Sequence, residues 1–184
     1  VSQIPTVLVS QLAKRHVTVA LSGDGGDELF CGYKRYFLQK KIWNVVSKIP
    51  ALLRPMVAFA IEHFPGSLAK LLIQALPKKY RVANVEDRLP KLAEWVNHKY
   101  FENFYLQSVS HLKTAGQTVL NSRLNEAKFK DLTTTISGLH DQEKMMLLDI
   151  LTYLPDDILH KLDRASMAVS LEARVPFLDH HLVE

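Results

Sequence analysis

The chain has 184 residues, of which 47% are hydrophobic and 23% charged, and its formal net charge is +4. These proportions are ordinary for a soluble globular protein, and the scattered positive charge gives no sign of a nucleic-acid-binding face. The single cysteine, Cys31, excludes an internal disulfide and a zinc site built from several cysteines. No apolar stretch is long enough to span a membrane and no signal peptide is visible, so we expect a cytoplasmic protein without membrane or nucleic-acid partners.

The first 41 residues follow a helix–strand–turn–helix pattern. Residues 4–14 predict a helix with Pro5 in its first turn and with Leu8 and Leu12 on one face. The continuous apolar run over residues 17–21 is rich in β-branched side chains, which favours a strand buried on both faces of a parallel sheet. A glycine-rich turn and a helix over residues 27–41 follow. In α/β sheets of this kind, ligands bind at the carboxyl end of the strand.

Everything after the glycine-rich turn is expected to be helical. The helices predicted from apolar spacing are residues 56–64, 68–76, 86–98, 142–153 and 154–168, with weaker periodicity over 118–129 and a loop at 133–138. The aromatic and leucine side chains of the middle region are expected to form core, because no chemical motif lies between residues 41 and 138. The sequence thus predicts a mostly helical α/β fold, divided into residues 1–41, a helical middle region over 42–140 and a final segment over 141–184.

The glycine-rich turn concentrates the chemistry of the chain. Residues 21–33 contain four of the seven glycines and three carboxylates, those of Asp24, Asp27 and Glu28. A strand followed by a glycine turn and a helix presents bare backbone N–H groups to a phosphate. Carboxylates at the same turn would repel that phosphate unless a divalent cation lies between them. The sequence therefore predicts a nucleotide–metal site at this turn.

Two segments together resemble the synthetase domain of the glutamine-dependent asparagine synthetases. Residues 22–33 are similar to that family's Ser-Gly-(Glu/Asp)-Gly-(Ser/Gly)-Asp-Glu-(Leu/Val)-Phe-x-Gly-Tyr signature. Residues 163–179 are similar to its Asp-Arg-x-x-Met-Ala…Glu-x-Arg-Val-Pro-Phe-Leu-Asp signature. The resemblance implies part of a parallel-sheet domain of the adenine-nucleotide alpha-hydrolase-like (PP-loop ATP pyrophosphatase) type, with the middle region as a long helical insertion. It also implies ATP and Mg²⁺ as cofactors.

The resemblance implies a reaction and its partners. Members of the family join the side-chain carboxylate of aspartate to AMP, release pyrophosphate, and let ammonia attack the acyl-adenylate to give asparagine and AMP. The ammonia comes from glutamine, which a glutaminase domain in the same parent chain hydrolyses. A carboxylate is a poor electrophile, so it needs a good leaving group, and the charge of the departing pyrophosphate must be offset. A homodimer is compatible with the resemblance.

The resemblance also implies roles for residues at matching positions. Asp27 is the expected Mg²⁺ ligand, and Asp24, Asp157 and Arg174 are the expected catalytic residues. The residues expected to contact ATP are Leu21, Ser22, Gly23, Asp24 and Gly25. Many members have Glu where Asp24 stands, and Cys31 replaces a position that is usually Gly. Glu28 is expected to be structural or to support the metal ligand.

Two parts of the family's active site do not occur in these residues. An upstream Ser-Gly-Gly-x-Asp-Ser loop is missing, and relatives carry a further lysine beyond the position of Glu184, so we expect this chain alone to be inactive. The chain begins with Val1 and ends within a stretch typical of a helix, which indicates a piece of a longer protein. We expect the histidines, including His180 and His181, to be structural.

Other hypotheses stay open at this point. The same mechanism could amidate another carboxylate, such as a sugar uronate, and no residue of the chain chooses between the acceptors. A β-lactam-forming relative would have Tyr where Asp24 stands. The chain could also be a non-catalytic helical interaction domain, although such a scaffold has no need for carboxylates crowded at a phosphate-binding turn.

Overall fold

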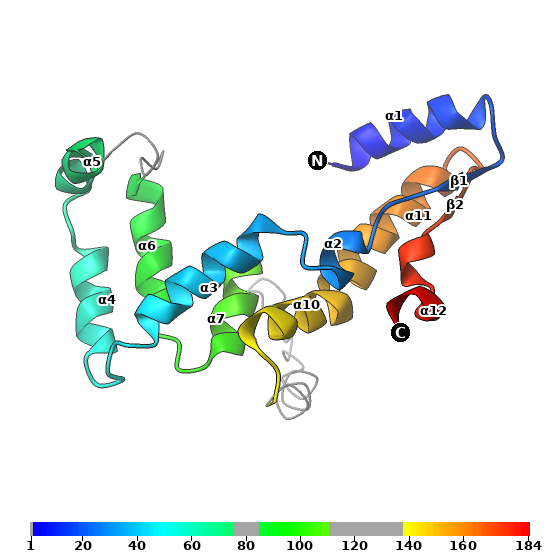
Figure 1. Cartoon of the computed structure of the whole chain (residues 1–184). Helices are drawn as coiled ribbons and strands as arrows, with labels where there is room; N and C mark the ends of the chain where they lie inside the picture. Colours follow the sequence, from blue (N-terminus) through cyan, green and yellow to red (C-terminus); the bar gives the residue numbers. More distant parts are fainter. Residues whose placement is uncertain (1, 76–84, 111–137) are drawn as a thin grey trace, which may run out of the picture. The chain divides into compact units, whose positions relative to one another are not determined.

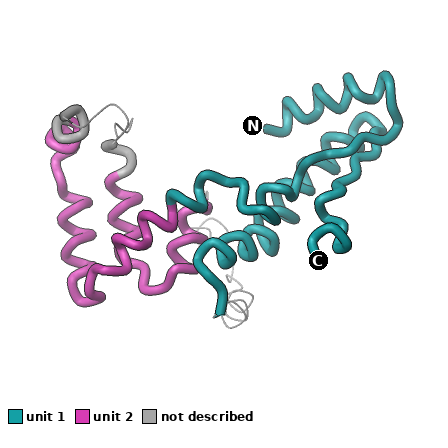
Figure 2. Tube along the Cα trace, viewed as in Figure 1, with its two compact units in different colours: residues 1–38, 138–184 teal, residues 39–137 magenta. Residues whose placement is uncertain are grey.

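The computed structural model describes residues 2–75, 85–110 and 138–184 (Figure 1). The chain divides into two compact units: residues 1–38 with 138–184 form unit 1, and residues 39–137 form unit 2 (Figure 2). The architecture is a mostly helical α/β fold with one small parallel sheet, as the sequence predicted. In the described ranges, no helix is both long enough and apolar enough to cross a membrane.

Unit 1 contains both strands and the helices beside them. Its first elements are α1 (Gln3–Lys14), β1 (Val19–Leu21), α2 (Gly26–Leu29) and the start of α3 (Lys34–Val46). After residue 138 come α10 (Asp141–Leu151), the π-helix η2 (Leu154–Leu159), α11 (His160–Met167), β2 (Glu172–Arg174), the 3-10 helix η3 (Pro176–Leu178) and α12 (His180–Val183). The helices expected over residues 4–14 and 142–153 are confirmed as α1 and α10. The one expected over residues 154–168 begins as the wider π turn of η2 and continues as α11.

The sheet joins segments from the two ends of the chain. β1 and β2 pair in parallel, with Leu21 opposite Arg174 (Figure 1). The backbone N–H of Ser22 donates to the carbonyl of Arg174 at 2.8 Å, which extends the ladder into the glycine turn. The prediction of purely helical structure after the turn is therefore wrong at β2. Its Glu-Ala-Arg sequence has no apolar alternation, so pairing with β1 and not local propensity makes it a strand.

The strand expected to be buried on both faces is shorter and more exposed than predicted. β1 covers three residues of the apolar run, and the side chains of Val19 and Leu21 are 38% and 74% exposed. α1 packs against α11, and both border a pocket that reaches Ala20 on β1. Val19 and Leu21 remain exposed, whereas Ala20 between them is half-buried.

The helix expected over residues 27–41 is two helices, α2 and α3, separated by a tight break. Cys31 has a φ of 57°, in the left-handed region that interrupts a right-handed helix. The N–H of Gly32 donates back to the carbonyl of Asp27 at 2.9 Å and closes the break. The prediction of one continuous helix is therefore wrong, and α2 is a single turn of four residues.

Unit 2 is helical in the described residues, and aromatic side chains form its core. Its helices are α4 (Arg54–Glu62), α5 (Gly66–Ala75), α6 (Val85–Val96) and α7 (Phe101–Val109). The ring centroids of Trp43 and Phe104 are 5.3 Å apart, and Phe101, Phe104 and Tyr105 are buried. The prediction that aromatic and leucine side chains of the middle region form core is confirmed for these aromatic residues, but it is wrong for Leu52, Leu68 and Phe59, which are exposed. The periodicity noted over 118–129 and most of the loop expected at 133–138 lie outside the described residues.

Candidate active site

The residues expected to contact ATP follow one another at the carboxyl end of β1, and the turn has a defined local geometry. The Ser22 hydroxyl donates to Asp24 Oδ2 at 2.5 Å, and the Asp24 N–H donates to Ser22 Oγ at 3.4 Å. Gly25 has a φ of 83°, in the left-handed region that favours glycine, and is the N-cap residue of α2. The half-buried carboxylate of Asp24 is thereby held next to the start of α2.

The second signature segment packs directly on this turn. A Cβ added to Gly25 would lie 2.9 Å from Leu178 Cδ2, and one added to Gly26 would lie 3.2 Å from the Phe177 ring. Phe177 also meets the ring of Phe30 edge-on, with centroids 5.8 Å apart. The glycines therefore leave room for η3 as well as allowing the turn. Together with the β1–β2 pairing, these contacts bring residues 22–33 and 172–178 side by side.

Asp27 lies on the exposed side of α2. A Cβ added to Gly32 would overlap Asp27 Oδ1, so the carboxylate rests over that glycine. Asp27 is exposed, whereas Asp24 is half-buried and its Oδ2 accepts the Ser22 hydroxyl. Carboxylate oxygens are ligands that Mg²⁺ prefers. The carboxylate chemistry of the turn therefore fits a magnesium ion, and Asp27 remains its predicted ligand.

The two remaining expected catalytic residues differ in their relation to the turn. Arg174 lies opposite Leu21 in the sheet, but its Nε donates to the Glu172 carboxylate at 2.7 Å and both side chains are mostly exposed. Asp157 lies exposed on η2. Within the part of the chain that the structure describes, no hydrogen bond or ion pair joins either side chain to Asp24 or Asp27. The structure thus brings the backbone of Arg174 to the turn and leaves Asp157 on a separate helix.

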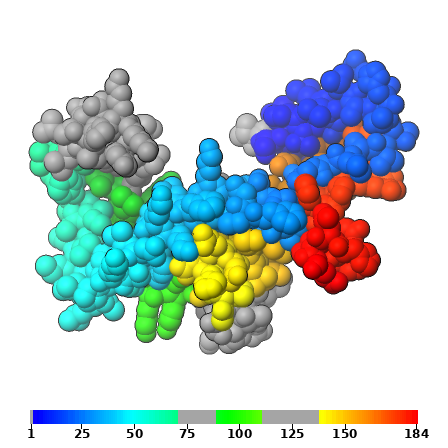
Figure 3. All heavy atoms as spheres, viewed as in Figure 1, coloured from blue at the N-terminus to red at the C-terminus, as the bar shows by residue number. Residues whose placement is uncertain are grey.

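Next to the turn lies a buried polar cluster that the sequence analysis did not predict. Glu28 and Asp149 are each only 1% exposed. The Tyr33 hydroxyl donates to Glu28 Oε1 at 2.6 Å, whereas Asp149 Oδ2 accepts from Arg35 at 2.6 Å and from the Tyr36 hydroxyl at 2.5 Å. Figure 3 shows α10, in yellow, directly against the blue segment that carries these partners. The cluster therefore fastens the segment after the glycine turn to α10.

The guanidinium of Arg35 also holds aromatic rings together. Its Cζ lies 4.2 Å from the centroid of the Tyr33 ring and 4.8 Å from that of Tyr153, within the range of cation–π contacts. Burial raises the pKa of Tyr33 above its ordinary value, and the hydrogen bond to Glu28 raises it further. Burial and the hydrogen bond to Asp149 raise the pKa of Tyr36 in the same way. Burial, followed by the charge of Asp157, raises the pKa of Tyr153.

Two signals in the sequence point to this cluster. Arg35 lies between Tyr33 and Tyr36 in the segment Tyr-Lys-Arg-Tyr. Asp149 directly follows Leu148 on the buried face of α10, where a charge needs a partner. The partner could not be chosen from the sequence, because Arg35 and Asp149 are separated by 114 positions.

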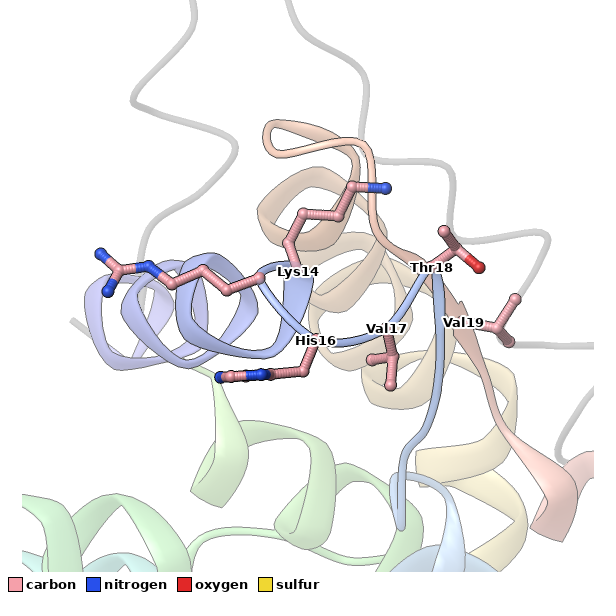
Figure 4. Close-up of a pocket in the computed structure, with 6 residues that line it drawn as sticks. Lys14, His16, Val17, Thr18 and Val19 are labelled. Carbon is pink, nitrogen blue, oxygen red and sulfur yellow. The ribbon is translucent and has the colours of Figure 1, made fainter.

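Two of the pockets that border the sheet differ in their position relative to the glycine turn. One of about 340 Å³ lies between α1, α11 and both strands, and Ser22 and Asp24 form its wall at the glycine turn. A more open pocket of about 500 Å³ lies at the amino end of β1, where the side chains of Lys14, His16 and Thr18 point in different directions (Figure 4). The smaller pocket reaches a carboxylate of the turn, whereas the larger one lies at the opposite end of the strand.

A separate group of metal-ligating side chains lies at α12. Ligand atoms of Asp179, His180 and His181 are within 4.8 Å of one another, and all three residues are exposed. Asp179 Oδ1 already accepts the N–H of His181 at 3.0 Å and so caps α12. The predicted metal ligand, Asp27, is not part of this group.

Comparison with known proteins agrees with the two signature segments. The whole chain, residues 1–184, matches the family model described as asparagine synthase. It is 34% identical over 186 residues to asparagine synthetase (glutamine-hydrolyzing) 1 of Bacillus subtilis strain 168, which covers 96% of this chain and 25% of the relative. A relative from Mycobacterium bovis, provisionally named asparagine synthetase (glutamine-hydrolyzing), is 31% identical over 183 residues, which covers 96% of this chain and 24% of the relative. No solved structure is significantly similar to the chain.

The chain belongs to the asparagine synthase family. The resemblance carried by residues 22–33 and 163–179 is thereby confirmed, and the match extends over the helical middle region as well. The chain spans about a quarter of the length of these relatives.

Proposed function

We propose that this chain forms part of an ATP-dependent, amide-forming ligase that converts aspartate to asparagine. The side-chain carboxylate of aspartate is joined to AMP as pyrophosphate leaves, and ammonia from glutamine then displaces AMP. The observation that carries this proposal is the contact between the two signature segments at the carboxyl end of β1. Ligands of open α/β sheets bind at that end of the strands.

The glycine turn supplies the proposed nucleotide and metal contacts. Ser22 and Gly23 offer a hydroxyl and backbone N–H to the phosphates, and Leu21, Asp24 and Gly25 flank them. Asp27 holds Mg²⁺, which would offset the charge of the departing pyrophosphate when bound. Asp24, whose carboxylate accepts the Ser22 hydroxyl, acts at the acyl-adenylate step when ammonia enters.

Arg174 and Asp157 are proposed to complete the catalytic set. The Arg174 guanidinium is mostly exposed and paired only weakly, through an exposed ion pair with Glu172, so it is free to turn to a carboxylate or phosphate. Asp157, exposed on η2, supplies a further carboxylate.

The same family membership supports the proposed organisation of the whole protein. Residues 1–41 and 141–184 contribute to a PP-loop ATP pyrophosphatase-type sheet domain, and residues 42–140 are a helical insertion. The separation of residues 39–137 as a compact unit supports this division. We further propose a glutaminase domain in the same parent chain, a cytoplasmic location and assembly as a homodimer.

The test of this function uses the full-length parent protein. It is incubated with ATP, Mg²⁺, aspartate and either glutamine or ammonia, and AMP, ADP and asparagine are quantified. The proposal predicts AMP and asparagine in equal amounts. AMP formed with a sugar uronate but not with aspartate would overturn the substrate and keep the mechanism. Absence of turnover with any carboxylate would favour a non-catalytic interaction domain.

A further inference from the structure

We propose that Tyr33, acting through Glu28, is a positioning residue for the metal ligand Asp27. This inference rests on the proposed function, in which Asp27 holds Mg²⁺. It assigns to the buried cluster next to the turn a role beyond holding the fold together. Asp27 and Glu28 both lie on α2, the short helix after the glycine turn.

α2 has little stability of its own. It contains four residues, begins after the left-handed Gly25 and is followed by the left-handed Cys31. One isolated helical turn is unfavourable because nucleation fixes several backbone angles for a single hydrogen bond. The orientation of Asp27 therefore depends on contacts that other parts of the chain make with α2.

Glu28 makes the buried polar contact of this turn. Asp27 is exposed, whereas its neighbour Glu28 is 1% exposed and accepts the Tyr33 hydroxyl at 2.6 Å. A buried carboxylate without a donor is costly, so loss of this hydrogen bond would drive Glu28 toward water and rotate α2 with it. Because adjacent residues share the same backbone turn, Asp27 would move as well.

Tyr33 is itself held in place. Its ring lies 4.2 Å from the Arg35 guanidinium, which pairs with Asp149 on α10 at 2.6 Å. The ring also meets that of Tyr153 edge-on at 6.4 Å, directly before η2. The Tyr33 hydroxyl is thus a fixed donor, and it connects α2 to the helix that carries Asp157.

Tyr36 provides a matched control. Its hydroxyl also donates to a buried carboxylate, Asp149, at 2.5 Å, and burial raises its pKa as it does that of Tyr33. Asp149 lies on α10 and, unlike Glu28, is not adjacent to Asp27 in the sequence. Tyr33→Phe and Tyr36→Phe therefore delete the same atom, one from a half-buried and one from a fully buried tyrosine, and only the first deletion removes a donor to the neighbour of the metal ligand.

The test measures binding of Mn²⁺ to the full-length protein in the presence of a non-hydrolysable ATP analogue, by electron paramagnetic resonance. Tyr33→Phe is expected to weaken Mn²⁺ binding about tenfold, the usual effect of losing a residue that orients a metal ligand. Tyr36→Phe is expected to change the Mn²⁺ affinity less than about twofold and to lower the thermal midpoint as much as Tyr33→Phe. Glu28→Gln, which still accepts a hydrogen bond, should retain more affinity than Glu28→Ala.

Equal loss of Mn²⁺ affinity in the two tyrosine variants would overturn the inference, as would unchanged affinity in Tyr33→Phe. Either result, with Asp27→Asn abolishing binding, would leave the proposed metal role of Asp27 intact. If Asp27→Asn bound Mn²⁺ as wild type does, the metal role and the inference would both fall.

Discussion

The glycine turn and the adjacent buried cluster place their acidic residues in opposite environments. At the turn, Asp27 is exposed and Asp24 is half-buried and accepts the Ser22 hydroxyl. In the cluster, Glu28 and Asp149 are sealed from solvent and receive tyrosine and arginine donors. Asp27 and Glu28 are neighbours in sequence and lie on the same helical turn. That turn therefore carries one exposed carboxylate that can meet a ligand and one buried carboxylate that stabilises the fold.

Asp27 illustrates how a carboxylate is kept exposed on the glycine turn. Carboxylates that are buried with donors stabilise one conformation, because removing a donor leaves an unpaired charge. Carboxylates exposed beside them can then bind a cation without having to hold the turn themselves. The proposed chemistry and the local stability are in this way assigned to different side chains.

The largest expected loss of stability is at the buried ion pair between Arg35 and Asp149. Arg35→Met leaves the Asp149 carboxylate buried without its cation, which we expect to lower the free energy of unfolding by about 3 kcal/mol. Urea denaturation of the full-length protein measures the change. Arg174→Met is the matched control, since it breaks an exposed ion pair and should cost less than about 1 kcal/mol. Equal losses of unfolding free energy in the two variants would show that the buried ion pair stabilises the fold no more than the exposed one.

A smaller loss is expected at the contact between the turn and η3. Gly25→Ala places a Cβ at a φ of 83° and 2.9 Å from Leu178, which we expect to cost about 2 kcal/mol. Gly138→Ala is the control, because a Cβ there meets no atom within 4 Å. Thermal unfolding of both variants gives the comparison. A Gly25→Ala variant as stable as Gly138→Ala would contradict the described packing of η3.

A gain in stability is expected at the break between α2 and α3. Cys31 adopts a φ of 57°, so Cys31→Gly removes strain of about 1 kcal/mol. Ser170, which has the same φ of 57°, allows the same substitution at a site away from the turn. Both glycine variants should raise the thermal midpoint. A lower midpoint in Cys31→Gly alone would mean that the thiol makes a packing contact that outweighs the backbone strain.

The smallest effect is confined to alkaline pH. Because the folded-state pKa values of Tyr33 and Tyr36 are raised above the ordinary value near 10, the folded protein retains protons that the unfolded chain loses. The stabilisation from these tyrosines is therefore complete below about pH 10 and declines as the pH rises above it. In the double variant Tyr33→Phe/Tyr36→Phe, the free energy of unfolding measured by urea denaturation should decline less steeply between pH 9 and pH 11 than in the wild type. An unchanged slope would mean that the hydroxyls are not buried as described.

Local signals in the sequence predicted much of unit 1, and long-range contacts account for the rest. Apolar spacing identified α1 and α10, and the glycine turn was located from its composition. β2 was missed because Glu172, Ala173 and Arg174 become a strand only through pairing with β1. The Arg35–Asp149 pair was missed for the same reason, since no local pattern chooses a partner 114 positions away. The prediction of one continuous helix over 27–41 was wrong at Cys31, because apolar periodicity gives no sign that a residue has a left-handed backbone.

The most direct test of the account is pyrophosphate release by the full-length protein and by its Asp27→Asn variant. Both are supplied with ATP, Mg²⁺, aspartate and ammonia, and their thermal unfolding is compared. The account predicts release by the wild type, a loss of at least about 100-fold in the variant, and the same thermal midpoint in both, because Asp27 is exposed. Release at the wild-type rate by Asp27→Asn would contradict the assignment of this carboxylate to the metal.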